Sequence, residues 1–151
     1  MNKSIIYFCF LVLFLSCTQK KRVELNLTKQ GKKEGIHISY DSIGRLEIAT
    51  YKNNLLDGEY ILYHIGNQRI MRKEIYKNGL ENGQAYYFYS NGSVQAQREW
   101  KMGKKIGWAV DLYETGEKES NLRYNDDGCL VARYTYDKSG NLINIEEAQG
   151  K

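Results

Sequence analysis

The chain from residue 31 onward repeats itself with a period of roughly two dozen residues. Turn glycines recur at positions 44, 66, 92, 116 and 140, so their successive spacings are 22, 26, 24 and 24. Aromatic residues recur in the same phase at Tyr51, Tyr76, Trp100 and Tyr124. Five copies that keep phase predict a repeat architecture, in which one small structural unit is stacked on its neighbours.

Each copy has the composition of a β-hairpin. Two runs of six to nine residues, rich in β-branched and aromatic types, are separated by Asn, Asp, Ser and Gly. Asn78-Gly79 and Asn91-Gly92 are typical of tight hairpin turns. We therefore expect an all-β domain, an elongated single-layer antiparallel meander of about five stacked hairpins. About ten strands would give it a length of ~45 Å.

The repeat also resembles a known family. Residues 76–83, Tyr-Lys-Asn-Gly-Leu-Glu-Asn-Gly, with Tyr89 and Gly92 after them, resemble the bacterial variant of the MORN repeat (membrane occupation and recognition nexus). This resemblance covers about residues 31–124 and implies hairpins stacked side by side into a twisted sheet. Many bacterial members are labelled antitoxin-like, which implies an interaction role. Residues 40–46 and 136–142 resemble instead the Tyr-Asp repeats of Rhs-type shell proteins, and we interpret them as caps of the stack.

Residues 1–16 have the pattern of an export signal. Lys3 precedes an apolar run from Ile5 to Leu15, which is too short to span a bilayer as a helix. The run ends at Leu-Ser-Cys17, which resembles a bacterial lipobox, although Phe14 stands where that motif usually has Leu. We predict a lipoprotein signal peptide over 1–16 and lipidation of Cys17. An ordinary signal peptide or an uncleaved anchor is the alternative.

This reading places the protein in the bacterial cell envelope, lipid-anchored and facing the periplasm, in either the inner or the outer membrane. Residues 17–30 are predicted to form a basic, loosely ordered tether without a partner strand, and residues 31–151 the repeat domain. Residues 18–34 carry six basic and two acidic side chains, whereas residues 35–151 carry 15 and 16. Because the positive excess lies outside the predicted fold, nucleic acid is not an expected partner. A basic tether suits an anionic bilayer surface.

The sequence shows no catalytic or metal-binding signature. His37 and His64 have no Cys or carboxylate at ligand spacing, so we interpret both as strand or surface residues and predict neither metal nor cofactor. The segment Asp126-Asp127-Gly128 lacks the spacing of a calcium loop and is interpreted as a turn. No sequence motif pairs Cys129 with a histidine that could activate its thiol, so we predict that Cys129 is a small apolar strand residue. We do not expect an enzyme.

The leading hypothesis is a non-catalytic module that binds a protein partner, and binding of a toxin-like protein in an antitoxin or immunity role is a special case. The alternative is a glycan- or peptidoglycan-binding, or structural, envelope lipoprotein. We predict a contact surface on the third and fourth repeats, because large rings beside a cationic turn often form interface hot spots. Its residues are Trp100, Trp108, Lys101, Lys104 and Lys105. Otherwise the two indoles pack against neighbouring tyrosines and hold the stack together.

Overall fold

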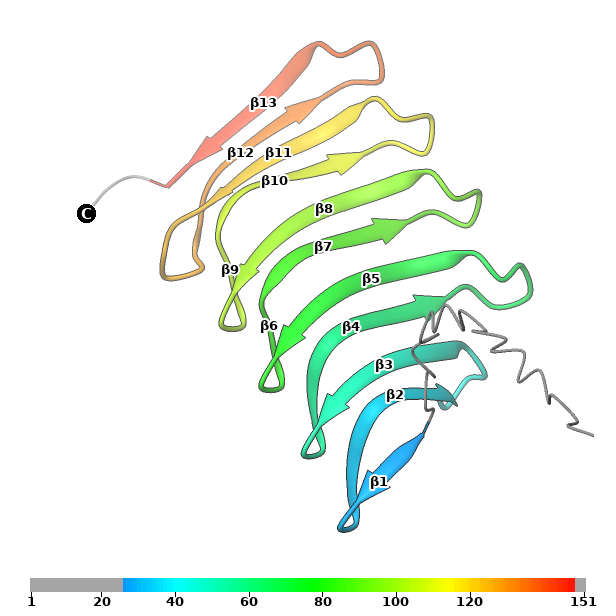
Figure 1. Ribbon diagram of the computed structural model, residues 1–151. Helices are drawn as coiled ribbons and strands as arrows, with labels where there is room; N and C mark the ends of the chain where they lie inside the picture. The colour runs from blue at the N-terminus through cyan, green and yellow to red at the C-terminus, as the bar shows by residue number, and fades with distance from the viewer. Residues whose placement is uncertain (1–25, 149–151) are drawn as a thin grey trace, which may run out of the picture.

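The computed structural model describes residues 26–148, which form one antiparallel sheet and contain no helix (Figure 1). The predicted all-β, single-layer meander of hairpins is confirmed. Cys17, the predicted signal peptide and the start of the predicted tether lie outside the described residues. In the part of the chain that is described, no helix is long and apolar enough to cross a membrane.

Eleven strands follow one another across the sheet in the order of the sequence, and every neighbouring pair is antiparallel. They are β1 (Leu27–Lys29), β2 (Lys32–Tyr40), β3 (Leu46–Lys52), β4 (Leu55–Tyr63), β5 (Ile70–Lys77), β7 (Gly83–Phe88), β8 (Val94–Lys101), β10 (Gly107–Leu112), β11 (Lys118–Tyr124), β12 (Leu130–Tyr136) and β13 (Leu142–Glu147). The two-residue strands β6 (Leu80–Glu81) and β9 (Lys104–Lys105) extend the turns after β5 and β8. Figure 1 shows β1 and β13 at opposite ends of the sheet.

One rim of the sheet, here called the short-turn rim, is built from two-residue turns. Both central residues of each turn have positive φ, as type I′ turns require, and glycine or asparagine supplies most of them. The pairs are Gln30 and Gly31, Asn53 and Asn54, Asn78 and Gly79, and Met102 and Gly103. Successive turns are also hydrogen-bonded to the neighbouring repeat, since the Gly79 amide donates to the Leu56 carbonyl at 2.8 Å. Local turn chemistry therefore ties the repeats together along this rim.

The opposite rim, the loop rim, carries longer loops that are closed by a backbone hydrogen bond. The Tyr89 amide donates to the Ser93 carbonyl at 2.9 Å, and the Asp137 amide to the Asn141 carbonyl at the same distance. The loop from His64 to Arg69 is one residue longer than these. Gln68, with φ of 54°, occupies the phase in which the other loops have glycine. A displaced glycine in this one loop therefore explains why the spacings on either side of Gly66 are uneven.

Two of the strands that leave the short-turn rim, β4 and β7, contain a glycine at a position where a side chain would crowd the neighbouring strand. A Cβ on Gly58 would lie 2.9 Å from the Cβ of Thr50, and a Cβ on Gly83 would lie 3.3 Å from that of Ile75. Both glycines also have φ near 130°, which L-residues with side chains rarely adopt. Side-chain atoms of the neighbouring strand thus fill the space beside these glycines. The long strands are arched rather than flat in Figure 1.

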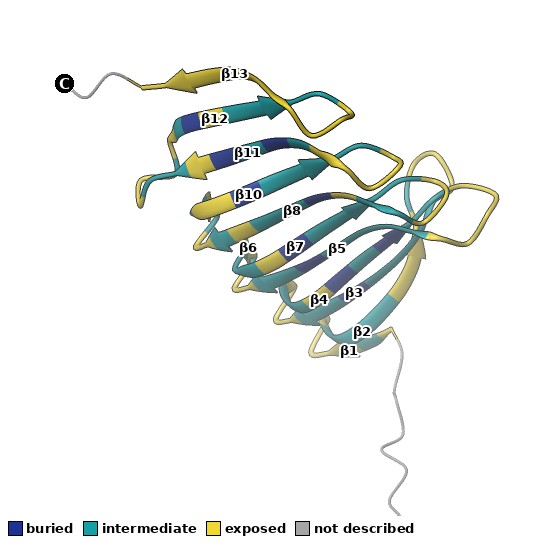
Figure 2. Cartoon of the chain, turned by 90° about the horizontal axis from the view of Figure 1, so that it is seen from above, coloured by how far each residue is buried: buried dark blue, intermediate teal, exposed yellow. Residues whose placement is uncertain are grey.

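Nearly all buried side chains project from one face of this curved sheet, which we call the inner face. The strand registers place nine of the ten buried residues on it, and Ala132 is the exception on the outer face. The nine are Ala49, Tyr60, Leu62, Glu74, Ala85, Ala96, Ala109, Ser120 and Leu122. In Figure 2 the buried segments lie within the strands, away from the turns. The core is thus a thin strip along the sheet.

The sheet begins earlier than predicted. β1 pairs with β2, and the Asn26 amide donates to the Ile36 carbonyl at 2.7 Å, so residues 27–29 of the predicted tether belong to the fold. The prediction that this segment has no partner strand is wrong. β1 is added to the sheet by the turn at Gln30 and Gly31, which is equivalent to the other short turns. The turn was not expected because Gln is not a usual residue at positive φ.

Cys129 is not in a strand, contrary to the prediction. It is exposed and ends a loop in which the Asn125 amide donates to the Cys129 carbonyl at 3.0 Å. Asn125 Oδ1 in turn accepts hydrogen bonds from the amides of Asp127 and Cys129. A loop of the longer type thus replaces the two-residue turn at this place on the short-turn rim. The predicted turn at residues 126–128 is confirmed.

Candidate functional site

A hollow of about 500 Å³ lies on the inner face over β5, β7, β8 and β10. Side chains of both charges and aromatic rings line it. Its main contributors are Arg72, Glu74, Arg98, Trp100, Lys105 and Asp111. Two of these, Trp100 and Lys105, belong to the contact surface predicted from the sequence.

Glu74 is the most enclosed charged group of the hollow, with 2% of its surface exposed. Its carboxylate accepts hydrogen bonds from the hydroxyls of Tyr76, at 3.1 Å, and Tyr87, at 2.9 Å. The Nε atom of Arg72 lies 3.5 Å from the same carboxylate. Burial, and then the charge of Glu74, raise the pKa of both tyrosines. Both phenols therefore remain protonated and hold the carboxylate in place.

Arg98 and Asp111 form the second charged pair of the hollow. The Arg98 guanidinium contacts the Asp111 carboxylate and donates to the Val110 carbonyl at 2.8 Å. The Ser120 hydroxyl donates to the other oxygen of Asp111 at 2.8 Å. These side chains come from three neighbouring strands, β8, β10 and β11, so the pair also joins two repeats. Its polar atoms are thus engaged with one another and with the backbone.

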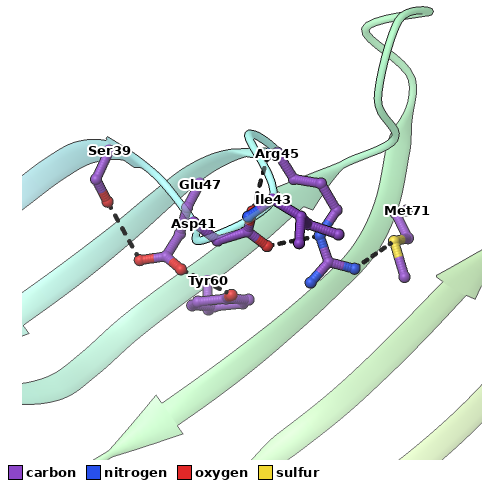
Figure 3. Close-up of polar contacts among 7 residues, drawn as sticks. All are labelled: Ser39, Asp41, Ile43, Arg45, Glu47, Tyr60 and Met71. Atoms are coloured by element: carbon purple, nitrogen blue, oxygen red, sulfur yellow. Dashed lines mark hydrogen bonds and ion pairs between the residues drawn. The ribbon is translucent and has the colours of Figure 1, made fainter.

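The same arrangement recurs nearer the N-terminus, where Figure 3 shows Glu47 between Ser39 and Tyr60. The Tyr60 hydroxyl donates to Glu47 at 3.1 Å, as the two tyrosines of the hollow donate to Glu74. At the adjoining loop, Arg45 pairs with Asp41 at 2.6 Å. The inner face thus carries a series of carboxylates that are held by tyrosine, serine or arginine along several repeats.

The structure does not gather the five predicted contact residues into one patch. Trp100 is half-buried on the inner face, where the Nζ atom of Lys105 lies 5.3 Å from the centre of its ring. Trp108 follows Gly107 in β10 and projects from the outer face, with 57% of its surface exposed. Because the two indoles point to opposite sides of a single layer, one flat partner surface cannot contact both.

The outer indole packs instead against C-terminal neighbours. The Trp108 and Tyr134 ring centres are 6.1 Å apart, and the Arg123 guanidinium lies 6.0 Å from the indole. The remaining two predicted residues, Lys101 and Lys104, flank the turn between β8 and β9 on the short-turn rim, and both are exposed. Of the five, the structure therefore brings only Trp100 and Lys105 into the hollow.

Sequence reasoning missed four of the six main contributors to the hollow, namely Arg72, Glu74, Arg98 and Asp111. A signal was present in β8, where Ala96, Arg98 and Trp100 alternate with polar residues and so share its drier face. A charged residue in such a series needs a partner, because an unpaired charge is costly to bury. What the sequence does not show is which carboxylate on a neighbouring strand supplies that partner.

Both histidines contact the backbone of a neighbouring segment. His37 lies in β2, in agreement with its interpretation as a strand residue, whereas His64 is half-buried in the loop that follows β4. The Nε2 atom of His64 lies 2.9 Å from the carbonyl of Phe88, and that of His37 lies 2.9 Å from the carbonyl of Leu27. In later repeats a tyrosine takes the place of His64, since the Tyr89 hydroxyl donates to the Leu112 carbonyl at 2.8 Å. Among residues 26–148, no group of three or more His, Cys, Asp or Glu side chains could hold a metal ion.

Comparison with known proteins adds no identification. No family model matches the chain, and no curated protein matches its sequence.

Proposed function

We propose that this chain is a non-catalytic lipoprotein of the bacterial cell envelope, whose repeat sheet binds a protein partner at the inner-face hollow. The observation that carries the proposal is the composition of the hollow, which Arg98, Asp111 and Lys105 line together with the half-buried Trp100. Aromatic and arginine side chains together are typical of interface hot spots. The carboxylates Glu74 and Asp111 are held by hydrogen bonds to their neighbours, which favours recognition over general acid–base chemistry.

Cys17 is the proposed point of attachment, with residues 1–16 as the signal peptide and the periplasm as the compartment. A diacylglyceryl group supplies two acyl chains, which suffice for stable anchoring. We also propose membership of the bacterial MORN-type repeat family, which the regular period and the recurring glycines support. An antitoxin or immunity role is the special case in which the partner is a toxin-like protein.

A protein partner is favoured over a glycan because cations occupy most of the recurring aromatic rings of the inner face. In the row of Tyr51, Tyr76, Trp100 and Tyr124, a lysine lies over every ring except that of Tyr76. The Nζ atom of Lys33 lies 4.6 Å from the centre of Tyr51, and that of Lys105 lies 5.3 and 5.5 Å from Trp100 and Tyr124. A sugar ring that stacks on these aromatics would first have to displace the cations.

The test is affinity capture of the full-length chain from bacterial membranes. We expect one stoichiometric protein, and we expect Lys105→Glu to abolish its capture. Lys73→Glu is the matched control, because Lys73 lies on the outer face and pairs with the exposed Glu59. Capture that survives the Lys105 change, or retention on peptidoglycan in place of a protein, would overturn the proposed partner. In parallel, Cys17→Ser should release the protein from the membrane fraction, and its continued retention would contradict the anchor.

A further inference from the structure

The last strand of the sheet, β13, has an edge that is open to pairing. All six of its residues are exposed, and Ile145 retains 52% of its surface. The strand contains no Lys or Pro, residues that commonly protect such edges. The opposite edge of the sheet is different, because β1 has three residues and includes Lys29. Within the described residues, β13 is therefore the edge at which pairing is least opposed.

The repeat itself shows that this edge has the geometry to accept a strand. Positions 72, 96, 120 and 144 are equivalent, because they occupy the same phase of successive repeats. In the first three copies this position pairs with the next repeat, as Arg72 with Tyr87, Ala96 with Asp111 and Ser120 with Thr135. The fourth, Asn144, pairs only with Thr135 on the side of β12. The strands that carry the first three of these positions, β5, β8 and β11, have the same register shift as β13. The shift therefore does not prevent a further strand from pairing.

We propose that β13 pairs antiparallel with β13 of a second copy of this chain, with Ile145 on the two-fold axis. A two-fold interface must be self-complementary, because the same surface meets itself. Within each chain the Asn144 amide donates to Glu146 at 3.0 Å. In this register Asn144 also lies opposite Glu146 of the other copy, so the second amide hydrogen of Asn144 and the second carboxylate oxygen of Glu146 can form two further hydrogen bonds across the axis. No carboxylate then faces another carboxylate directly, whereas an axis at Glu146 would oppose two of them.

The outer face favours the same register. Ile145 lies beside Tyr134 of β12, and Tyr134 lies beside Trp108. Pairing about Ile145 places the two isoleucines together and joins the exposed aromatic groups of both copies into one continuous apolar strip. The Tyr134 hydroxyl holds Glu147 at 2.6 Å, which keeps that carboxylate occupied within its own chain. The exposed Ile145 of each copy would thus be covered by Ile145 of the other.

Cysteine cross-linking in cells tests this register directly. The background is the full-length chain with Cys129→Ser, a substitution that removes the exposed Cys129 thiol. The test variant adds Ile145→Cys to this background. Directly opposed residues in an antiparallel pair have Cα atoms about 4.5–5.5 Å apart, within the range of a disulfide. We expect most of the Ile145→Cys protein to migrate as a disulfide-linked dimer after mild oxidation of the membranes, at twice the mass of the chain.

Two controls use the same background. Leu142→Cys lies on the same strand. In this register the two copies of residue 142 are offset by six residues, or about 20 Å along the strands. The Leu142→Cys protein should therefore remain monomeric. Thr28→Cys on the β1 edge measures random collision. Dimers at 142 or 28 as abundant as at 145, or no dimer at 145, would overturn the proposal. So would a product whose mass indicates a different protein.

A second pair of variants avoids changing Ile145. Co-expressed chains with different tags carry Asn144→Cys and Glu146→Cys, and we expect a mixed disulfide between them because these residues are directly opposed. Its absence, with each chain folded, would exclude this register. The inference does not depend on the proposed partner, since Lys105→Glu should leave the cross-link at 145 unchanged.

Discussion

The two faces of the sheet are made from the same strands, yet they differ in how much surface they bury. Both carry aromatic and charged side chains in alternation, but nine of the ten buried residues among those described lie on the inner face. On the inner face, Glu74 and Leu62 are almost completely enclosed, whereas Trp108 on the outer face is mostly exposed. A flat single layer would expose both faces equally. The curvature of the sheet is therefore what allows one face to bury side chains.

The largest expected effect is on stability, and it comes from comparing substitutions on the two faces of a single strand, β4. Leu62 and Ile61 are adjacent in β4, nearly equal in volume and on opposite faces. Leu62→Ala should lower the free energy of unfolding by about 2–5 kcal/mol, because it leaves a cavity in the thin core. Ile61→Ala, at a half-exposed position, should cost clearly less. Denaturant unfolding measures both, and equal losses would show that the two faces contribute alike.

A second pair of variants compares a buried carboxylate with an exposed one. Glu74→Ala should cost about 2–3 kcal/mol, since it leaves the Tyr87 hydroxyl without its acceptor and Arg72 without its partner. Glu59→Ala removes an exposed ion pair with Lys73 on the outer face, and such pairs contribute about 0–1 kcal/mol. A Glu74 variant as stable as the wild type would mean that the inner carboxylates are not structural.

The tryptophans provide a third comparison. Trp100→Ala on the inner face should cost roughly 2 kcal/mol, in proportion to the apolar surface that its half-buried ring contributes. Trp108→Ala should change stability by less than about 1 kcal/mol and should instead weaken cross-linking at residue 145. Thermal unfolding and the cross-linking yield distinguish the two effects. Reversed results would place the packing role on the outer ring.

The smallest effect is an alkaline loss of stability. Burial and the charge of Glu74 raise the pKa of Tyr76 and Tyr87 above the ordinary tyrosine value of 10.0. The folded state therefore retains protons that the unfolded state releases, and the free energy of unfolding should fall as the pH rises beyond about 10. Tyr87→Phe should reduce this slope. Tyr134→Phe should reduce it less, since a hydrogen bond to the exposed Glu147 is the main cause of the raised Tyr134 pKa. Unfolding at several alkaline pH values measures the slope.

Much of the fold could be predicted because hairpins are local structures. Asn78-Gly79 forms its turn from two adjacent residues with positive φ, and the next strand follows at once. The candidate site was predictable only in part. Trp100 and Lys105 lie within six residues of one another and meet across one turn. Trp108 does not join them, because its place in β10 turns it to the outer face.

The amino-acid sequence by itself determined the period, the positions of most turns and the single antiparallel layer, since each depends on residues that are neighbours along the chain. Only the tertiary structure decided which face of the sheet buries its side chains and which charged residues pair with one another. Glu74 meets Tyr87, and Arg98 meets Asp111, through contacts between strands of different hairpins. The tertiary structure also added β1 to the sheet and left the edge of β13 open. These features depend on how the arched hairpins stack, and stacking is a property of neighbouring repeats rather than of any one of them.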